Sequence, residues 1–343
     1  MSEAAAKTGH IASRLAGLHV YFFVATALQA QPCDLGCFIT SSEWLDVAYG
    51  KVVRNLLTNG LGLQAIHLID RHTMPFEDAQ TTGAIVCFEV TSDRGGVSVS
   101  LGSRKVAGPQ IGSGRTIALD SLIHAERWTP ALLDRTPHAE GLQSLGEIAR
   151  VHRGIATGAN GFFVISRQEA KLFGIERWCV PVVSDGREIL QSNFEIRDGE
   201  ERKVLVVFPR DVDRASHPEV DQYLRMGEEE ILNGLPISQR YLCTHRRSWW
   251  NLGTIRRPPI VASYMARQPP RFALNPDRLG IINVAHGLYP GEDLPQERLQ
   301  LLVRSLNGSR ASFTGMGRTY QGGLEKFEPR EMEALRFKWV TDG

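Results

Sequence analysis

The stretch Leu35-Gly-Cys-Phe-Ile-Thr-Ser-Ser42 is a short apolar run that ends in three hydroxyl-bearing residues. This pattern is typical of a buried strand of a parallel sheet that opens into a loop at its carboxyl end. Apolar residues spaced by three and four predict a helix over 11–30 before it, and a second helix over 47–58 after it. Strands are predicted over 63–69 and 83–90. This order predicts half of a doubly wound α/β sheet that begins in its middle, with an antiparallel hairpin at its edge.

The character of the chain changes further on. We interpret 116–141, which holds Trp128, Pro130 and Pro137, as a connector, and we place a domain boundary near residue 130. From Gln143 onward turns are dense and helices are fewer. Short β runs are predicted over 162–165, 204–208, 260–264 and 281–284, and helices over 218–233, 295–306 and 329–335. The expected fold class is α/β, with a partial doubly wound sheet over 1–130 and a β-rich α+β domain over 131–343.

The bulk composition is that of a soluble globular protein, with 42% hydrophobic and 22% charged residues in a chain of 343. The five cysteines form an odd, scattered set, which indicates reduced thiols and no disulfide framework. No apolar run is long enough to cross a bilayer, and the first residues lack a signal-peptide core. We therefore expect a cytoplasmic protein without a membrane partner.

One segment, 231–276, contains no Asp or Glu, although the net charge of the whole chain is only +1. It carries seven arginines and no lysine, with tyrosine, tryptophan and phenylalanine residues between them. Guanidinium groups pair with phosphates, and aromatic rings offer faces on which bases stack. The segment favours nucleic-acid binding. The alternative is an arginine-rich solvated face on an ordinary enzyme, whose aromatic residues belong to the core.

Five segments resemble, in order, the adenine-N6 DNA methyltransferases whose target-recognition domain follows the catalytic core (TaqI- and Eco57I-like restriction-modification methylases). Gly36-Cys-Phe-Ile-Thr-Ser-Ser-Glu-Trp-Leu-Asp46 is similar to the strand that follows the family's catalytic loop, and Pro75-Phe-Glu-Asp-Ala-Gln-Thr-Thr-Gly-Ala-Ile-Val-Cys-Phe88 to the loop and closing strand of that core. Gly154-Ile-Ala-Thr-Gly-Ala-Asn-Gly-Phe-Phe-Val164 resembles the opening of the recognition domain. Asn283-Val-Ala-His-Gly-Leu-Tyr289 and Gly317-Arg-Thr-Tyr-Gln-Gly-Gly323 resemble its later segments.

The chain departs from the family in two motifs. The Gly-containing turn that binds the cofactor and the Asn/Asp-Pro-Pro-aromatic loop of catalysis do not occur, and Pro258-Pro259 and Pro269-Pro270 stand in other contexts. The helix over 11–30 looks like the one that follows the catalytic loop, so the chain is expected to start downstream of the chemistry. We therefore assign no catalytic residue. S-adenosylmethionine is implied for the complete enzyme but not for this chain alone, and a separate chain would carry the amino-terminal half of the core.

The glycine-rich segment 154–161 is the first candidate DNA contact, through Arg153, Thr157 and Asn160. Glycines let the backbone approach an anion, while Asn and Thr can bond phosphates or base edges. The glycine spacing matches neither a dinucleotide fingerprint nor a Walker loop. The alternative is a tight β turn without a ligand.

The remaining candidate DNA contacts are cationic or aromatic residues farther along the chain. We expect one of each adjacent pair on a strand to face DNA, and exposed arginines or glycine-turn residues to meet phosphates. These candidates are Arg246, Arg247, Trp249, Trp250, Arg267, Arg271, Arg318, Tyr320 and Lys326. A buried role in the core is expected for His286.

No metal site is expected, because Cys33 and Cys37, like Cys243 and His245, lack a second ligand pair at zinc spacing. Thr40 and Ser41 end the first strand at the edge where α/β sheets bind ligands, but loop capping is the favoured role.

Two functional hypotheses from different classes follow. The first is sequence-specific recognition of double-stranded DNA as part of an adenine-N6 methyltransferase. The alternative is a nucleic-acid-binding or interaction protein on a degenerate methyltransferase scaffold. A gene fragment without a role and a small-molecule enzyme with an arginine-lined anionic pocket are less favoured.

Overall fold

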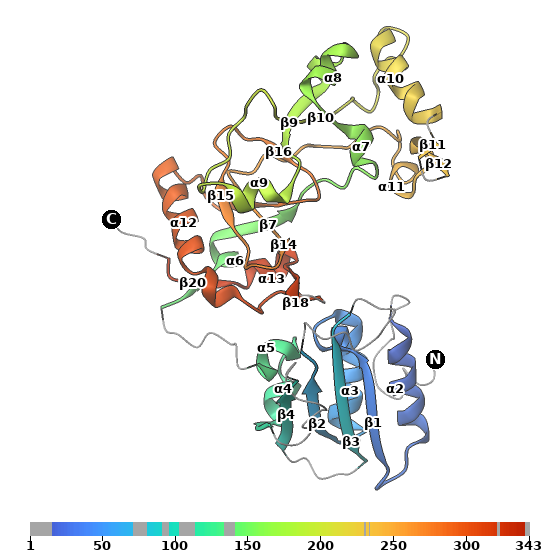
Figure 1. Ribbon diagram of the computed structural model, residues 1–343, viewed down its shortest axis with the longest axis vertical. Helices are drawn as coiled ribbons and strands as arrows, with labels where there is room; N and C mark the ends of the chain where they lie inside the picture. Colours follow the sequence, from blue (N-terminus) through green and yellow to red (C-terminus); the bar gives the residue numbers. More distant parts are fainter. Residues whose placement is uncertain are drawn as a thin grey trace. The chain divides into compact units, whose positions relative to one another are not determined.

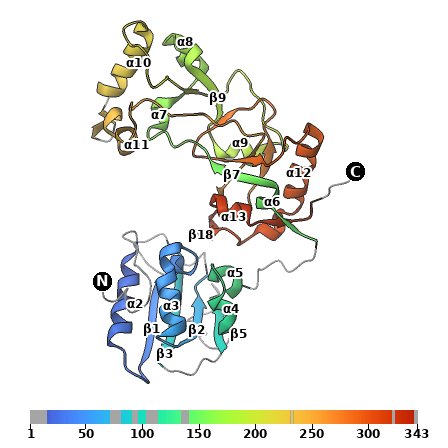
Figure 2. The same cartoon turned by 180° about the vertical axis from the view of Figure 1, so that it is seen from behind.

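The computed structural model divides the chain into two compact units (Figures 1 and 2). The first unit comprises Met1–His138 and Gly315–Lys326, and the second comprises Ala139–Thr314 and Phe327–Gly343. The structure describes residues 16–70, 81–90, 96–102, 114–133, 141–229, 231–232, 234–320 and 323–339. The predicted loop around Pro75 and the start of the first predicted helix lie outside these residues. Within them no helix is long and apolar enough to span a bilayer.

The first unit is built on a mixed five-stranded sheet with the order β1-β3-β2-β4-β5. Its strands are β1 (Leu35–Ser41), β2 (Leu63–Leu68), β3 (Gly83–Glu89), β4 (Gly96–Leu101) and β5 (Arg115–Ala118). β3 runs antiparallel to both β1 and β2, whereas β4 is parallel to β2 and antiparallel to β5. The predicted antiparallel pairing of the strands near 63 and 83 is confirmed, but they do not form the sheet edge, because β3 lies between β1 and β2.

β1 is an edge strand, which corrects its prediction as a buried parallel strand. Successive side chains of a strand point to opposite faces of the sheet. Phe38 points to the covered face and packs edge-on against Phe23, with 5.0 Å between the ring centroids. Leu35 and Ile39, on the other face, are 80% and 53% exposed. Only one face of β1 is therefore buried.

Helices α2 (Leu18–Gln29) and α3 (Lys51–Asn59) contribute to the core of the first unit together with the sheet. Residues 116–133 of the predicted connector also contribute to this core, which corrects that interpretation. This part of the chain forms β5, α4 (Leu119–Ile123) and α5 (Trp128–Leu132). Trp128 is buried, its indole N–H donates to the Leu122 carbonyl (2.8 Å), and its ring lies 5.9 Å from that of Trp44. A large apolar ring needs burial, and this need outweighs the turn signals of the neighbouring prolines.

The buried guanidinium of Arg54 on α3 holds the loop after β1. It donates to the carbonyls of Trp44 (2.6 Å), Val47 (3.2 Å) and Glu126 (3.0 Å). Trp44 belongs to the short 3-10 helix η1 (Ser42–Leu45). Val47 lies between η1 and the next 3-10 helix, η2 (Ala48–Gly50). One side chain thus donates hydrogen bonds to three backbone carbonyls in segments between the α-helices and strands.

The second unit contains two four-stranded sheets. One has the order β15-β13-β17-β7, with β7 (Ala149–Arg153), β13 (Ile260–Ala262), β15 (Phe272–Leu274) and β17 (His286–Pro290), all antiparallel. The other has the order β16-β9-β10-β8. Its strands are β8 (Val164–Ile165), β9 (Cys179–Val183), β10 (Val204–Val206) and β16 (Gly280–Ile281).

The three helices predicted for this region are confirmed as α10 (Pro218–Glu229), α12 (Gln296–Gly308) and α13 (Pro329–Glu333). The β run predicted over 162–165 is only partly correct, since α7 (Asn160–Phe163) precedes β8. The remaining elements are short: α6 (Leu145–Ile148), α8 (Arg167–Leu172), α9 (Gly186–Gln191), α11 (Tyr241–Thr244), η3 (Glu176–Trp178), η4 (Ile237–Gln239), η5 (Arg310–Phe313), β6 (Gln143–Ser144), β11 (Ile231–Leu232), β12 (Leu235–Pro236), β14 (Met265–Ala266), β18 (Arg318–Thr319), β19 (Glu325–Lys326) and β20 (Arg336–Phe337).

Replacing the buried guanidinium tests its role in the first unit. We expect Arg54→Met to lower the free energy of unfolding of this unit by about 3 kcal/mol, because it leaves several carbonyls without donors. Lys51→Met on the exposed side of the same helix should change it by less than about 0.5 kcal/mol. Urea unfolding followed by circular dichroism measures both, and equal effects would contradict the assignment.

Candidate functional site

The segment Gly154–Gly161, called the glycine loop below, follows β7 and includes the first two residues of α7 in the second unit. A Cβ atom on Gly154 would lie 1.9 Å from the Ile282 carbonyl oxygen, so a side chain there would displace the backbone. Gly158 has a φ of +84°, a conformation that favours glycine. The Asn283 amide N–H donates to the Ile155 carbonyl (2.9 Å) and joins the loop to the segment before β17. Gly154 therefore serves close backbone packing and Gly158 a left-handed turn, whereas a Cβ atom on Gly161 would meet nothing within 4 Å.

Two exposed amide side chains meet at the surface of this loop. The buried Thr157 hydroxyl donates to Asn160 Oδ1 (2.6 Å), and Asn160 Nδ2 donates to Asn283 Oδ1 (3.3 Å). The Tyr264 hydroxyl donates to the Asn283 carbonyl (2.9 Å). Amide side chains at the surface can pair with the N6 and N7 edge of adenine in the major groove. Asn283 was not among the predicted contacts, although the segment beginning with it carries part of the family resemblance.

Arginines behind the glycine loop pair with its carbonyls. Arg246 donates to the carbonyls of Ala156 (2.9 Å) and Thr157 (2.8 Å), and its guanidinium lies 5.7 Å from the Phe163 ring centroid. Arg240 donates to the Gly158 carbonyl (3.2 Å). Burial lowers the pKa of Arg246 below its usual range, but arginine remains charged. The expected strand at 246–250 is absent, because α11 ends at Thr244 and turns follow.

Both tryptophans predicted to contact DNA have partners inside the second unit. The Trp249 ring lies 5.6 Å from that of Phe162. The Trp250 N–H donates to the Pro209 carbonyl (3.1 Å), and the Arg214 guanidinium lies 5.9 Å from the Trp250 ring centroid. Their bodies are partly buried, so they help to hold the unit together.

The other predicted cations of this unit differ in exposure. The Arg153 guanidinium is largely exposed and pairs with Glu328. Arg271 donates to the Ser192 carbonyl (2.7 Å) and lies over the Phe194 ring. Arg247 and Arg267 are exposed. Exposure alone makes Arg247 and Arg267 more accessible to a phosphate than Arg271.

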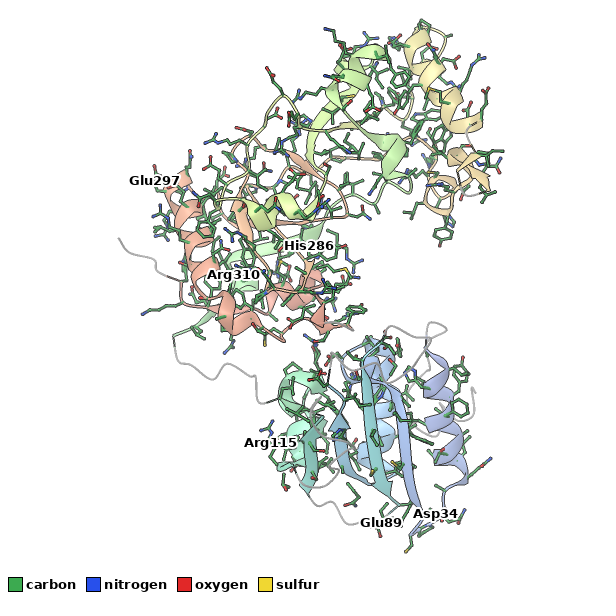
Figure 3. The ribbon with its side chains drawn as sticks, viewed as in Figure 1. Asp34, Glu89, Arg115, His286, Glu297 and Arg310 are labelled. Carbon is green, nitrogen blue, oxygen red and sulfur yellow. The ribbon has the colours of Figure 1, made fainter. Side chains whose placement is uncertain are left out.

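His286 lies in the core, as predicted (Figure 3). Its Nε2 lies 3.0 Å from the Phe327 carbonyl oxygen, and its ring stacks on that of Tyr264 at 4.5 Å. Burial lowers the pKa of His286, so the neutral ring donates from Nε2 to this carbonyl. The histidine thus supports Tyr264, which in turn holds Asn283.

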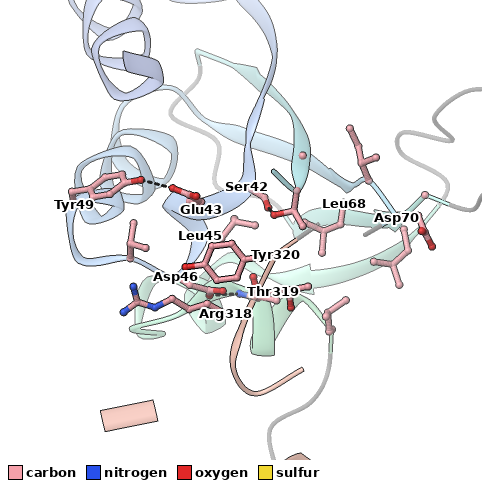
Figure 4. A pocket seen from close by; sticks show the side chains of 18 residues that line it. Ser42, Glu43, Leu45, Asp46, Tyr49, Leu68, Asp70, Arg318, Thr319 and Tyr320 are labelled. Carbon is pink, nitrogen blue, oxygen red and sulfur yellow. Dashed lines mark hydrogen bonds between the residues drawn. The ribbon is translucent and has the colours of Figure 1, made fainter. Parts of the chain in front are cut away.

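A pocket of about 410 Å³ lies in the first unit, at the edge of the sheet where β1, β2 and β4 end (Figure 4). Residues from those strand ends, the turns after β1, helix α5 and the segment 318–320 line it. They are Ser42, Glu43, Leu45, Asp46, Val47, Tyr49, Leu68, Ile69, Asp70, Thr82, Gly83, Leu101, Gly102, Thr129, Leu133, Arg318, Thr319 and Tyr320. Ligands of open α/β sheets bind at this edge, and the volume suits a small molecule.

Polar contacts fix part of this pocket. The Tyr49 hydroxyl donates to Glu43 Oε2 (3.0 Å), and the Thr129 amide donates to Asp46 Oδ1 (3.1 Å). Burial, reinforced by the Glu43 carboxylate, raises the pKa of Tyr49 to about 12, so the phenol stays protonated. Arg318 and Tyr320, predicted as phosphate contacts, line this pocket. Lys326 lies opposite Arg318 in the register of the antiparallel strands β18 and β19.

Thr40 and Ser41 cap the loop after β1, as favoured from the sequence. Thr40 Oγ1 accepts a hydrogen bond from the Trp44 indole (3.0 Å), and Ser41 Oγ accepts from the Glu43 amide (3.4 Å). The pocket residues Glu43, Asp46 and Tyr49 were overlooked as site residues, although the first segment of family resemblance, Gly36–Asp46 with Tyr49-Gly50, contains them.

Residues 123–342 match the C-terminal domain of the type II methyltransferase M.Eco57I. The chain is 38% identical to the type II methyltransferase M.XamI of Xanthomonas campestris pv. amaranthicola, over 95% of this chain and 60% of that protein. It is 26% identical to M.AccI of Acinetobacter calcoaceticus, over 92% of this chain and 61% of that protein. The chain thus spans about 60% of the length of these curated relatives.

The fold resembles that of MmeI, a type IIL restriction-modification enzyme solved in complex with DNA. The TM-score is 0.54 at 11% sequence identity, and the match covers 91% of this chain and 40% of MmeI.

The neighbouring residues Arg246 and Arg247 provide a matched test of whether the hydrogen bonds of Arg246 hold the glycine loop in place. We expect Arg246→Ala to lower the free energy of unfolding by about 2–4 kcal/mol, because its charged hydrogen bonds to loop carbonyls are lost. Arg247→Ala, at an exposed position, should change it by less than about 0.5 kcal/mol. Thermal and urea unfolding of the two variants measure this difference. An unchanged free energy of unfolding in Arg246→Ala would show that the glycine loop does not depend on the hydrogen bonds of Arg246.

Proposed function

Because the chain belongs to the type II methyltransferases that share the M.Eco57I C-terminal domain, we propose that it recognises a DNA sequence for an adenine-N6 methyltransferase. Double-stranded DNA would bind the second unit, and a separate chain would supply the cofactor site and the catalytic loop. The observation that carries the proposal is the contact between two exposed amides within the matched domain, Asn160 of the glycine loop and Asn283 of the segment before β17.

The distribution of charge supports a duplex as the ligand. The acid-free segment 231–276 packs behind the glycine loop through Arg240 and Arg246, while Arg247, Arg256, Arg257 and Arg267 are exposed. Exposed arginines attract phosphates along the backbone, whereas the amides can distinguish bases. MmeI, whose fold this chain resembles, was solved with DNA bound.

Duplex binding across a salt series tests the first part of the proposal. The logarithm of the association constant should fall linearly with the logarithm of the salt concentration. Arg247→Ala should reduce the magnitude of this slope by about one if the side chain contacts a phosphate. Fluorescence anisotropy with a random-sequence duplex measures both. Affinity that is independent of salt would contradict DNA binding through the arginine-rich segment.

The amide pair is tested by sequence preference. We expect Asn160→Ala and Asn283→Ala to relax the preference at one or two base pairs by about 1–3 kcal/mol, without changing the salt slope. Asn193→Ala, at an exposed position of the same unit, is the control. Sequencing of duplexes selected by each variant measures the preference. Unchanged preference in both variants would remove the amides from base recognition.

The pocket of the first unit is proposed as this chain's share of the methyltransferase site. Its hydroxyl groups, carboxylates and apolar side chains fit a planar polar heterocycle such as an adenine. The residues do not fit S-adenosylmethionine by themselves, since the chain lacks the glycine turn of the family. Methyl transfer would therefore depend on the separate chain.

The edge strand β1 supports the need for such a chain. It lacks charged residues and proline, the usual protection of an exposed strand edge. Its side chains Leu35 and Ile39 are exposed on one face of the sheet, and Leu18 and Phe22 are exposed on α2, which packs on the other face. An unprotected edge of this kind is stabilised when another strand pairs with it. The part of M.XamI that the chain does not cover is a polypeptide of suitable size to supply this strand.

Coexpression with the part of M.XamI outside the matched region tests this partner. We expect the two to copurify, and Cys37, exposed on the same face as Ile39, to become protected from alkylation. Ile39→Asp should abolish copurification, while Ile123→Asp, exposed on α4 of the same unit, should not. Copurification that survives Ile39→Asp would contradict docking at β1.

A further inference from the structure

Helix α11 displays an aromatic side chain beside the glycine loop. Tyr241, its first residue, is 74% exposed, and the next residue, Leu242, is exposed as well. The third residue, Cys243, is fully buried and anchors the helix in the core of the second unit. Burial of a phenol ring normally stabilises a fold, so a tyrosine held this far into solvent contributes little to the stability of this chain alone.

The exposed ring is nevertheless held in place. The His245 ring packs against it with 4.2 Å between the centroids, and His245 Nδ1 donates to the Tyr241 carbonyl (2.6 Å). The two rings are tilted by 42° to each other, and Tyr241 stays 74% exposed beside the histidine. Because the ring is already restrained, little rotamer entropy would be lost when a ligand binds it.

The helix that carries Tyr241 is fastened to the glycine loop on both of its flanks. Arg240, just before the helix, donates to the Gly158 carbonyl, and Arg246, just after it, donates to the carbonyls of Ala156 and Thr157. A Cβ atom on Gly158 would lie 3.0 Å from the Leu242 Cβ atom, so loop and helix are in direct contact. Figures 1 and 2 both show α11 beside α7, whose first residue is Asn160.

We propose that Tyr241 is an apolar wedge that stacks on or between bases of the duplex bound by the second unit, next to the amides of Asn160 and Asn283. This inference rests on the proposed DNA recognition and assigns it a contact of a different kind. Insertion of an apolar side chain between base steps unstacks them and bends the duplex. Arg240 and Arg246 are positioning residues, since they set the ring relative to the loop without facing the ligand.

Charge favours a nucleic acid over a protein partner at this surface. Tyr241 lies in the acid-free segment 231–276, and exposed Arg247 follows it closely. Glu228, on the neighbouring helix α10, is already paired with Arg214 (2.7 Å). Stacking of a base on an aromatic ring tolerates any base, so the contact adds affinity at the site chosen by the amides.

The test compares Tyr241→Ala and Tyr241→Phe with wild type across a salt series, using a labelled random-sequence duplex. Loss of the ring should weaken binding by about 5- to 100-fold at every salt concentration and leave the salt slope unchanged, because stacking releases no counterions. Tyr241→Phe, which keeps the ring, should bind within about twofold of wild type. Leu172→Ala, at an exposed apolar position elsewhere in the unit, is the control for surface apolarity.

A second readout reports insertion itself. A duplex with 2-aminopurine at a TA step, which unstacks readily, should brighten on binding wild type and Tyr241→Phe but not Tyr241→Ala. Wild-type affinity and fluorescence in Tyr241→Ala would overturn the wedge and leave DNA recognition intact. A changed salt slope in Tyr241→Ala would also overturn it, by showing an altered phosphate contact. Failure of wild type to bind any duplex would reject the proposed function together with the wedge.

Discussion

Arginine side chains donate to several backbone carbonyl groups in the loops, turns and helix ends of this chain. Arg54 joins the turns after β1 to the loop before α5, Arg115 donates to the carbonyls of Ala131 and Leu132, and Arg246 holds the glycine loop. In the second unit, Arg310 donates to the carbonyls of Pro269 and Pro270 (Figure 3). A guanidinium offers five donors in a fixed plane, so one residue satisfies several carbonyls at once. The irregular segments around both sites depend on this pairing.

This use of arginine explains which parts of the candidate site were predictable. Composition identified the acid-free segment, and family resemblance identified the loop that carries Asn160. Neither could show that Arg246 faces carbonyls instead of solvent, because its partner Ala156 lies ninety residues away in the chain. Asn283 was overlooked for a similar reason, since it becomes part of the site only through its contacts with Asn160 and Tyr264. Local patterns reveal residue chemistry, whereas long-range pairing decides how it is used.

The same distinction applies to the fold. Periodicity predicted the strands near 35, 63 and 83 and the helices α10, α12 and α13, because each pattern is local. The position of β3 between β1 and β2 depends on pairing across the sheet, and the alternation within each strand does not encode it. Trp128 is a second example of a role that local patterns did not predict. The prolines near it indicated a connector, but Trp128 is buried and contributes to the core.

The segment Gly315–Lys326 packs with the first unit, although the chain on both sides of it belongs to the second. Residues up to Tyr320 must therefore be synthesised before the lining of the pocket is complete, so the two units cannot mature strictly one after the other. For the same reason, exchanging the second unit between relatives would require three splice points instead of one.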